Sequence, residues 1–238
     1  MDGRRVAWVT GAGGALGAAV VGRLADEGYV GVASVRRNGG TLPPDWREHT
    51  GDLTQAAVAE QAVALALGTF GRLDLAVLAA GAWEGGAPIQ NADADAFGRQ
   101  MAANGETAWQ SARAAASALA RPGGARGPRA LVLVAAFGAL ARPAPMGQAA
   151  YRAAKAAVVG LAEAMATDLA ASGVSVFALA PTTLRTEANR QAMPGADAAA
   201  WIALDEVAAL VAFLATAPAR ILSGAVLPLD GRVRPDRP

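Results

Sequence analysis

The chain has 238 residues, of which 53% are hydrophobic and 17% are charged, with a formal net charge of +1. This length and apolar content predict a single globular domain over residues 1–238, and the near-neutral charge gives no electrostatic reason to expect nucleic acid or an anionic membrane as a partner. Cysteine is absent, which excludes disulfides and thiolate metal sites. No apolar run approaches the roughly 20 residues of a membrane span, and the start of the chain has no signal-peptide core, so we expect a cytoplasmic protein.

The first apolar run, residues 6–9, predicts a buried strand that leads into a glycine-rich turn and then a helical pattern through Val20, Val21 and Leu24. A strand, a glycine turn and a helix in this order are typical of dinucleotide binding, because the backbone can approach the pyrophosphate at the helix N-terminus. A plain tight turn is the alternative. The position after the first strand favours a cofactor site at Thr10, Gly11, Gly13, Gly14, Ala15, Leu16 and Gly17.

The second predicted strand, residues 30–35, ends in Arg36 and Arg37. In a dinucleotide fold this strand end faces the adenosine ribose, where an acidic residue binds the 2′-hydroxyl of NAD and an arginine accommodates the 2′-phosphate of NADP. Two solvated surface arginines would look the same. Given the glycine turn upstream, we expect NADP(H) in preference to NAD(H).

Residues 38–48 predict a loop, and residues 49–53 predict a short strand that brings Asp52 and Leu53 beside the cofactor, with Asp52 a candidate for the adenine edge. His49 is the only histidine. Because nothing acidic or basic is spaced to join it in binding a metal, we interpret His49 as structural and expect no metal site.

Small residues follow the next strand, residues 73–78, which comes after a predicted helix at residues 54–67. Ala80 and Gly81 could let the cofactor lie close to the chain. In the loop beyond them Trp83 is either a lid or stacking surface for a flat substrate, or a packing anchor. Residues 93–119 predict one long helix or two, and Asn104 lies inside this stretch, where an asparagine is mildly unfavourable and therefore suggests a polar task.

The remaining pattern continues the alternation. We expect a surface loop at 121–129, a strand at 131–135, a helix at 151–172, a strand at 174–180, an irregular stretch from Pro181 to about residue 201, a helix at 204–214, a strand at 225–229 and a frayed tail at 232–238. Strands alternating with helices predict an α/β fold, a doubly wound Rossmann-type parallel sheet of about seven strands with helices on both faces. Ligands bind beyond the carboxyl ends of such strands.

Tyr151 and Lys155 lie four residues apart in an alanine-rich helical run, so their side chains share one helical face. Lys155 is the only lysine in the chain, and Tyr151 is one of two tyrosines. A lysine has a tunable pKa that an arginine cannot supply. The alternative is that one lysine survived among the arginines by chance.

These motifs together, in this order and across the whole length, resemble the short-chain dehydrogenase/reductase family; the terminal pair Asp230 and Gly231 belongs to the same pattern. The resemblance implies that Tyr151 is the general acid/base. It implies that Lys155 binds the nicotinamide ribose and lowers the phenol pKa, and that Asn104 holds a helix and a proton-relay water. It also places Pro181, Thr183 and Thr186 with Tyr151 and Lys155 among the cofactor-binding residues.

The chain departs from the family at the catalytic serine, normally about thirteen residues before the tyrosine. That position is Gly138, and residues 135–141 contain no hydroxyl. The dihydropteridine reductase branch of the family tolerates small residues there, and it is similar to this chain in its glycine-and-tryptophan loop and in residues 183–201. This resemblance implies a substrate site at Trp83, Gly138 and Asn189. Two differences stand against it, since that branch has an acidic residue in place of Arg36 and lacks the asparagine found here as Asn104.

The expected function is therefore an NAD(P)H-dependent oxidoreductase that passes hydride to a small conjugated acceptor. One alternative is a carbonyl reductase or alcohol dehydrogenase that works without the usual serine. Another, of a different class, is a non-catalytic NADP-binding sensor or scaffold. The resemblance also implies a homodimer or homotetramer that pairs through the helix carrying Tyr151 and Lys155, where Ala153, Ala156 and Ala157 would permit close packing, although core packing would explain the same alanines.

Overall fold

The computed structural model describes residues 3–37, 40–121, 127–141 and 143–231. The predicted tail at 232–238, the middle of the predicted surface loop at 121–129 and the start of the predicted loop at 38–48 lie outside the described residues.

Seven parallel strands form one sheet in the order β3-β2-β1-β4-β5-β6-β7. The central strands are runs of Val, Leu and Ala buried on both faces, as expected for a parallel sheet covered by helices. The order reverses direction between β1 and β4, which is where doubly wound sheets bind their ligands. The strands are β1 (Val6–Thr10), β2 (Val30–Val35), β3 (Trp46–Thr50), β4 (Leu75–Leu78), β5 (Arg129–Val134), β6 (Val174–Pro181) and β7 (Val226–Leu229).

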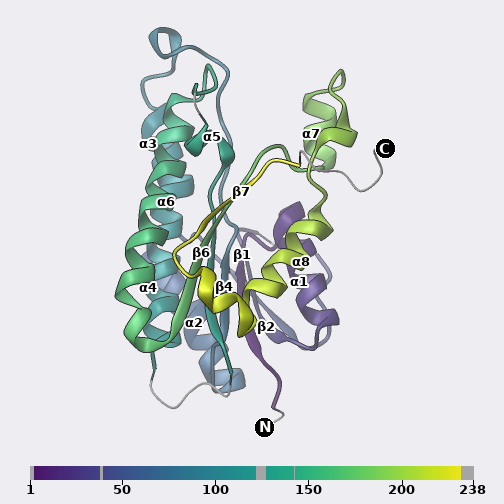
Figure 1. Ribbon diagram of the computed structural model, residues 1–238, viewed down its shortest axis with the longest axis vertical. Coiled ribbons are helices and arrows are strands. Elements are labelled where there is room, and N and C mark those ends of the chain that lie inside the picture. The colour runs from purple at the N-terminus through teal and green to yellow at the C-terminus, as the bar shows by residue number, and fades with distance from the viewer. Residues whose placement is uncertain (1–2, 38–39, 122–126, 142, 232–238) are drawn as a thin grey trace.

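Helices cover both faces of the sheet and create two cores (Figure 1). Along β1, Val6 and Trp8 point into one core, whereas Ala7 and Val9 point into the other. The first core is closed by α2 (Ala56–Phe70), α4 (Thr107–Leu119) and α6 (Ala149–Asp168), and the second by α1 (Ala15–Asp26) and α8 (Leu204–Leu214). The predicted fold class is confirmed.

Several short elements were not predicted. The helical stretch predicted at 93–119 is observed from residue 96, but α3 (Ala96–Gln100) passes into α4 through an unpredicted π-helical stretch, Met101–Glu106. A short α5 (Phe137–Leu140) follows β5, and α7 (Glu187–Ala192) lies within the stretch that was predicted to be irregular. Single 3₁₀ turns occupy Ile89–Asn91, Ala170–Ser172, Ala198–Ala200 and Pro218–Leu222. The strand predicted at 49–53 is β3, which begins and ends earlier.

Within the described ranges, no helix combines the length and hydropathy needed to cross a membrane.

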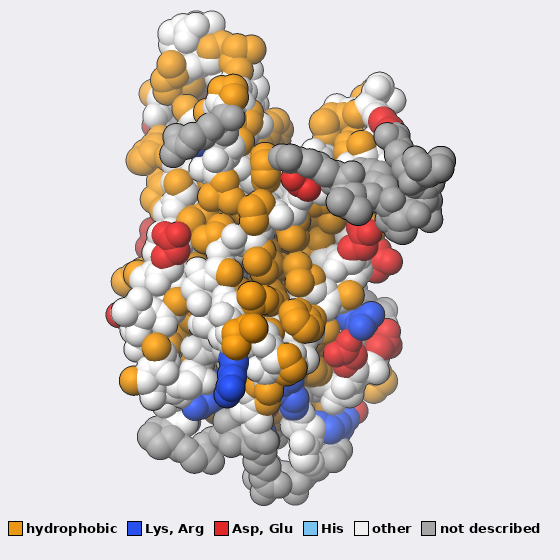
Figure 2. Space-filling model, in the orientation of Figure 1, with side chains coloured by type: hydrophobic (Ala, Val, Ile, Leu, Met, Phe, Trp, Pro, Cys, Tyr) orange, Lys and Arg blue, Asp and Glu red, His pale blue; other side chains and the backbone are white. Residues whose placement is uncertain are grey.

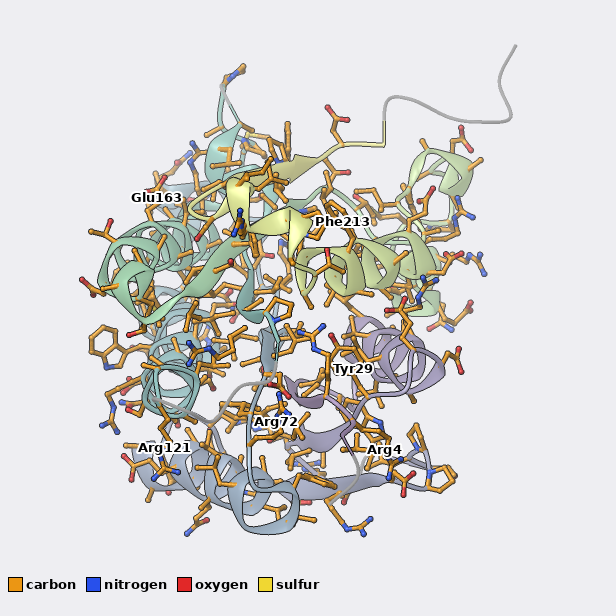
Figure 3. The ribbon with its side chains drawn as sticks, turned by 60° about the horizontal axis from the view of Figure 1, so that its bottom comes forward. Arg4, Tyr29, Arg72, Arg121, Glu163 and Phe213 are labelled. Atoms are coloured by element: carbon orange, nitrogen blue, oxygen red, sulfur yellow. The ribbon has the colours of Figure 1, made fainter. Side chains whose placement is uncertain are left out.

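A buried carboxylate, Asp74, joins the amino ends of the central strands. This end of the molecule faces the viewer in Figure 3, where the neighbouring Arg72 is labelled. Its Oδ2 accepts from the Val6 backbone N–H at 2.8 Å, and its Oδ1 accepts from Nη2 of Arg72 at 2.6 Å. Its own backbone N–H donates to the Val6 carbonyl, and its carbonyl accepts from the N–H of Ala130. Asp74 therefore ties β1, β4 and β5 together at their amino ends.

We expect Asp74→Ala to lower the free energy of unfolding by about 3–5 kcal/mol, because it leaves a guanidinium and a backbone N–H without their buried partner. Urea unfolding followed by far-UV circular dichroism measures the change. The matched control is Asp45→Ala, which breaks the exposed ion pair with Arg4 and should cost less than about 1 kcal/mol. Equal losses in the two variants would contradict a structural role for the buried pair.

Candidate active site

The turn between β1 and α1 is folded so tightly that two of its glycines have no room for a side chain. Gly11 has a φ of +69°, and a Cβ there would lie 2.8 Å from the backbone N of Ala80 at the end of β4. A Cβ on Gly17 would overlap the carbonyl of Gly11. Thr10 is buried, and its Oγ1 accepts from the N–H of Ala80 at 3.1 Å. The predicted glycine turn is thus clamped against the end of the neighbouring strand.

Helix α1 presents its N-terminus at this turn without a side-chain cap, since Gly14 is the N-cap residue and supplies no side-chain hydrogen bond. Gly13, Gly14 and Ala15 are exposed, whereas Leu16 and Gly17 turn toward the protein. An uncapped helix N-terminus carries partial positive charge and free-pointing N–H groups that suit a phosphate. The observed turn therefore fits the pyrophosphate of a nicotinamide dinucleotide.

Two exposed arginines, Arg36 and Arg37, follow β2 on the same edge of the sheet. Nη2 of Arg36 lies 3.9 Å from Oδ2 of Asp52, so the predicted ribose and adenine residues are neighbours. Hydrogen bonds from the backbone and hydroxyl of Thr54, aided by Arg36, hold the pKa of Asp52 below its usual value. The side chain of Leu53 is buried in the core, so only its backbone could meet a nucleotide.

The convergence of Gly81, Asn104 and Lys155 forms the centre of the site. A Cβ on Gly81 would lie 2.6 Å from Oδ1 of Asn104 and 3.2 Å from Nζ of Lys155. Asn104 is 1% exposed. Its Nδ2 donates to the carbonyl of Ala82 at 2.8 Å and to the carbonyl and side chain of Gln100, and its Oδ1 accepts from the N–H of Ala82 at 3.3 Å. The π-helical stretch thus places the asparagine, and the expectation of a polar task for it holds.

Lys155 is buried, and its Nζ donates to the carbonyl of Val134 at the end of β5 at 2.9 Å. The same Nζ lies 5.9 Å from the centroid of the Tyr151 ring. Burial lowers the pKa of Lys155 to about 8 and raises the pKa of Tyr151 to about 12. Removal of water from around the phenolate causes this rise, and it opposes the lowering of the phenol pKa that the resemblance implies for Lys155.

Gly138 lies in α5, and its carbonyl accepts a hydrogen bond from Nη1 of Arg152, one residue beyond Tyr151. The predicted substrate-side position is therefore tied to α6, the helix that carries Tyr151. A Cβ on Gly138 would lie 3.0 Å from Oε1 of Gln148, a half-buried side chain that the sequence analysis did not single out. Its one available signal was its position three residues before Tyr151.

The loop carrying Trp83 packs beside the start of α6. Gly86 donates from its N–H to the carbonyl of Gly147 at 2.9 Å, and Gly147 has a φ of +73° with Gly86 against it. Glu84 pairs with Arg99 of α3, which also reaches Asp93 at 2.5 Å. The indole of Trp83 is 61% exposed. This exposure does not fit a packing anchor, one of the two roles considered for Trp83, and it leaves an accessible face beside the start of α6.

The segment after β6 also reaches this end of the sheet, with Pro181 buried and Thr183 half-buried. Thr186 caps α7, its Oγ1 accepting from the N–H of Asn189 at 3.1 Å. Nδ2 of Asn189 donates to the carbonyl of Leu184 at 2.8 Å. The amide predicted to bind substrate thus holds its own segment together. Figure 2 shows the surface hollowed between the lobe of α3 and α5 and the lobe of α7, above the ends of the strands.

His49 is the last member of a row of hydrogen-bonding side chains that starts at Trp8. Nε1 of Trp8 donates to Oγ of Ser34 at 2.8 Å, and that oxygen lies 3.2 Å from Nδ1 of His49. Burial holds the pKa of His49 below its usual value. This arrangement agrees with the structural interpretation of His49.

Comparison with known proteins gives a consistent assignment. The family model described as short chain dehydrogenase matches residues 5–197. A D-threitol dehydrogenase of Mycolicibacterium smegmatis is 30% identical, covering 97% of this chain and 93% of its own length, and a galactitol 2-dehydrogenase of Rhizobium johnstonii is 32% identical, covering 97% and 95%. The structure of a 3-ketoacyl-(acyl-carrier-protein) reductase from Brucella melitensis complexed with NADH superposes with a TM-score of 0.83 at 26% identity, covering 96% of this chain and 97% of that one.

None of these three relatives is named for dihydropteridine reduction, so the expected closest resemblance to that branch gains no support from them. The family model matches most of the chain, and the two dehydrogenases are at least 30% identical to it over nearly its whole length. The chain belongs to the short-chain dehydrogenase/reductase family of oxidoreductases.

Proposed function

We propose that this enzyme transfers hydride between NADP(H) and a small-molecule substrate, with Tyr151 as the group that gives or takes the proton. The observation that carries the proposal is the convergence of Asn104 and Lys155 at Gly81, one helical turn from the phenol. A protein that only bound the nucleotide as a sensor or scaffold could use the lysine to hold a ribose, but it would need no proton donor one helical turn away. The bound cofactor supplies or accepts the hydride.

The protonation states of the pair fit this role in the direction of reduction. With a pKa of about 12, Tyr151 is a neutral phenol that can donate its proton to an oxygen formed on the substrate. With a pKa of about 8, Lys155 is mostly an ammonium near neutral pH, and it stabilises the phenolate that the donation leaves behind. Asn104 keeps the end of β4 in place through its two hydrogen bonds to Ala82.

We expect Tyr151→Phe to lower kcat/KM by at least about 100-fold, because the variant keeps the ring and loses the proton. The affinity for NADPH, measured by fluorescence titration, should fall by no more than about tenfold, because the variant loses at most one hydrogen bond to the cofactor and leaves the glycine turn intact.

The chain provides its own control in the only other tyrosine. Tyr29 is buried with a pKa that burial raises to about 12, and Arg5 lies 4.8 Å from its ring centroid. Tyr29→Phe should retain the wild-type rate. Full turnover by Tyr151→Phe on every substrate that the wild type uses would refute the proposed proton donor.

The preference for NADP(H) is proposed from Arg36 and Arg37, two exposed guanidinium groups at the end of β2. Arg36→Ala should raise KM for NADPH by about 10-fold or more, the effect of losing one charged hydrogen bond to the 2′-phosphate. KM for NADH should change by less than about twofold. Arg23→Ala removes an equal charge from the surface of α1 and is the matched control. An equal effect of Arg36→Ala on both cofactors would contradict the 2′-phosphate contact.

The substrate class that the relatives favour is a small hydroxylated alcohol and its ketone. Two of them, covering nearly the whole chain, are named for threitol and galactitol. The second candidate is the small conjugated acceptor expected from the sequence. It is favoured by the lack of a hydroxyl at residues 135–141 and by the exposed indole of Trp83, which could stack on a flat ring. Assays of threitol and galactitol with NADP⁺, and of their ketoses and quinonoid dihydropterin with NADPH, separate the two classes.

We also propose that the enzyme works as a homodimer or homotetramer. Ala153, Ala156 and Ala157 on α6 are exposed, so the core does not account for these small residues, and Trp109 on α4 is exposed to 54%. Small side chains would let a second copy of the helix approach closely.

A further inference from the structure

The amide of Gln148 occupies the place that a side chain on residue 138 would enter. A Cβ built on Gly138 would lie 3.0 Å from Oε1 of Gln148, closer than nine in ten Cβ contacts in proteins. Residue 138 is the position where the family carries its serine and this chain has none. A side chain on residue 138 and the amide of Gln148 would therefore compete for the same space. In this chain the amide is the polar group in that space.

Contacts on both sides fix the backbone that carries this amide. Gln148 is the N-cap residue of α6, and its carbonyl accepts from the N–H of Arg152 at 2.7 Å. The side chain of Arg152 reaches back to the carbonyl of Gly138. On the other side, the carbonyl of Gly147 accepts from Gly86 in the loop that carries Trp83. The separation between Gly138 and Gln148 is thus set by α5, α6 and the Trp83 loop together.

The side chain is also placed to act with the phenol. Gln148 and Tyr151 are three residues apart at the first turn of α6, so they project toward the same side. Within the described parts of the chain, no hydrogen bond holds the Gln148 amide, and the residue is half-buried. A carboxamide both donates and accepts, and rotation about its last bond exchanges the two ends. It can therefore present an N–H to an oxygen that Tyr151 protonates.

We propose that the carboxamide of Gln148 donates a hydrogen bond to the reacting oxygen of the substrate and does the work of the absent hydroxyl. This inference rests on the proposed function and deepens it. A donor at this position is useful to a carbonyl or alcohol oxygen, whose charge grows during hydride transfer, and it contributes little to an acceptor without such an oxygen. The glutamine therefore favours the alcohol and ketone class over the conjugated acceptor.

The test uses threitol and galactitol with NADP⁺ and their ketoses with NADPH. Gln148→Ala should lower kcat/KM by about 100-fold, the usual effect of removing one donor to a developing oxyanion. Gln148→Glu keeps the shape but cannot donate near neutral pH, and it should lose a comparable factor. NADPH affinity and the Tm should stay near the wild-type values in both. Gln110→Ala, a glutamine on α4 that bonds Glu106, is the matched control and should leave the rate unchanged.

The double variant Gly138→Ser with Gln148→Ala makes the sharpest test, because the alanine vacates the volume that a serine needs. It should recover at least about 10-fold of the loss, whereas Gly138→Ser alone should gain nothing. Wild-type rates in Gln148→Ala, or a loss that Gly138→Ser fails to recover, would overturn the role of Gln148 and leave the proposed function standing. Lack of turnover by the wild-type enzyme with every substrate, dihydropterin included, would instead refute the proposed function.

Discussion

The close approach of the chain at Gly81 to Asn104 and Lys155 is the constraint on which the site depends. A single added carbon would stand 2.6 Å from the asparagine oxygen and 3.2 Å from the lysine nitrogen. Neither group can easily withdraw. The Asn104 amide is bonded to Ala82 and Gln100, and Lys155 is held by the carbonyl of Val134. The end of β4, the π-helical stretch and α6 thus meet at a point that exists because residue 81 has no side chain.

Burial explains why a lysine stands at this point in a chain that otherwise uses arginine. Burial lowers the pKa of Lys155 to about 8, a shift toward neutrality that a guanidinium cannot make. Burial by itself does not mark a catalytic residue. Tyr29 and Tyr151 both have a pKa raised to about 12, yet Tyr29 lies near Arg5 at the opposite end of the sheet (Figure 3). The difference between the two phenols lies in their neighbours, because the ring of Tyr151 lies near Lys155 and that of Tyr29 near Arg5.

The sequence predicted the elements that have strong local signals. Strands buried on both faces, such as Val30–Val35, and the long amphipathic helix Leu204–Leu214 were predicted with their observed bounds. The edge strand β3 is mostly exposed, so its apolar pattern is weak and its predicted range was displaced. Helix α7 has six residues and is specified by the Thr186 cap, a signal too short for periodicity to detect.

In the site, too, residues with a local sequence signal were predicted, whereas contacts between distant segments were not. The glycine turn, Asn104, Tyr151 and Lys155 were singled out from the sequence. The glycine turn, Asn104 and Lys155 contact segments at the carboxyl ends of the strands. The engagement of the Asn189 amide with Leu184 and the raised pKa of Tyr151 were not predicted, because each depends on packing between segments. Gln148 was missed for that reason too, since its significance is a distance to Gly138 across the space between α5 and α6.

The most direct test of the account is the rate of Gly81→Ala. Gly81 has no left-handed backbone conformation, so alanine is tolerated locally, and a loss of rate with unchanged NADPH affinity comes from the crowding of Asn104 and Lys155. We expect an unchanged far-UV spectrum with kcat/KM reduced by about 10-fold or more, since displacing a positioning group by an ångström costs up to about 100-fold. A folded Gly81→Ala enzyme with the wild-type rate would show that the convergence at Gly81 does not control the chemistry.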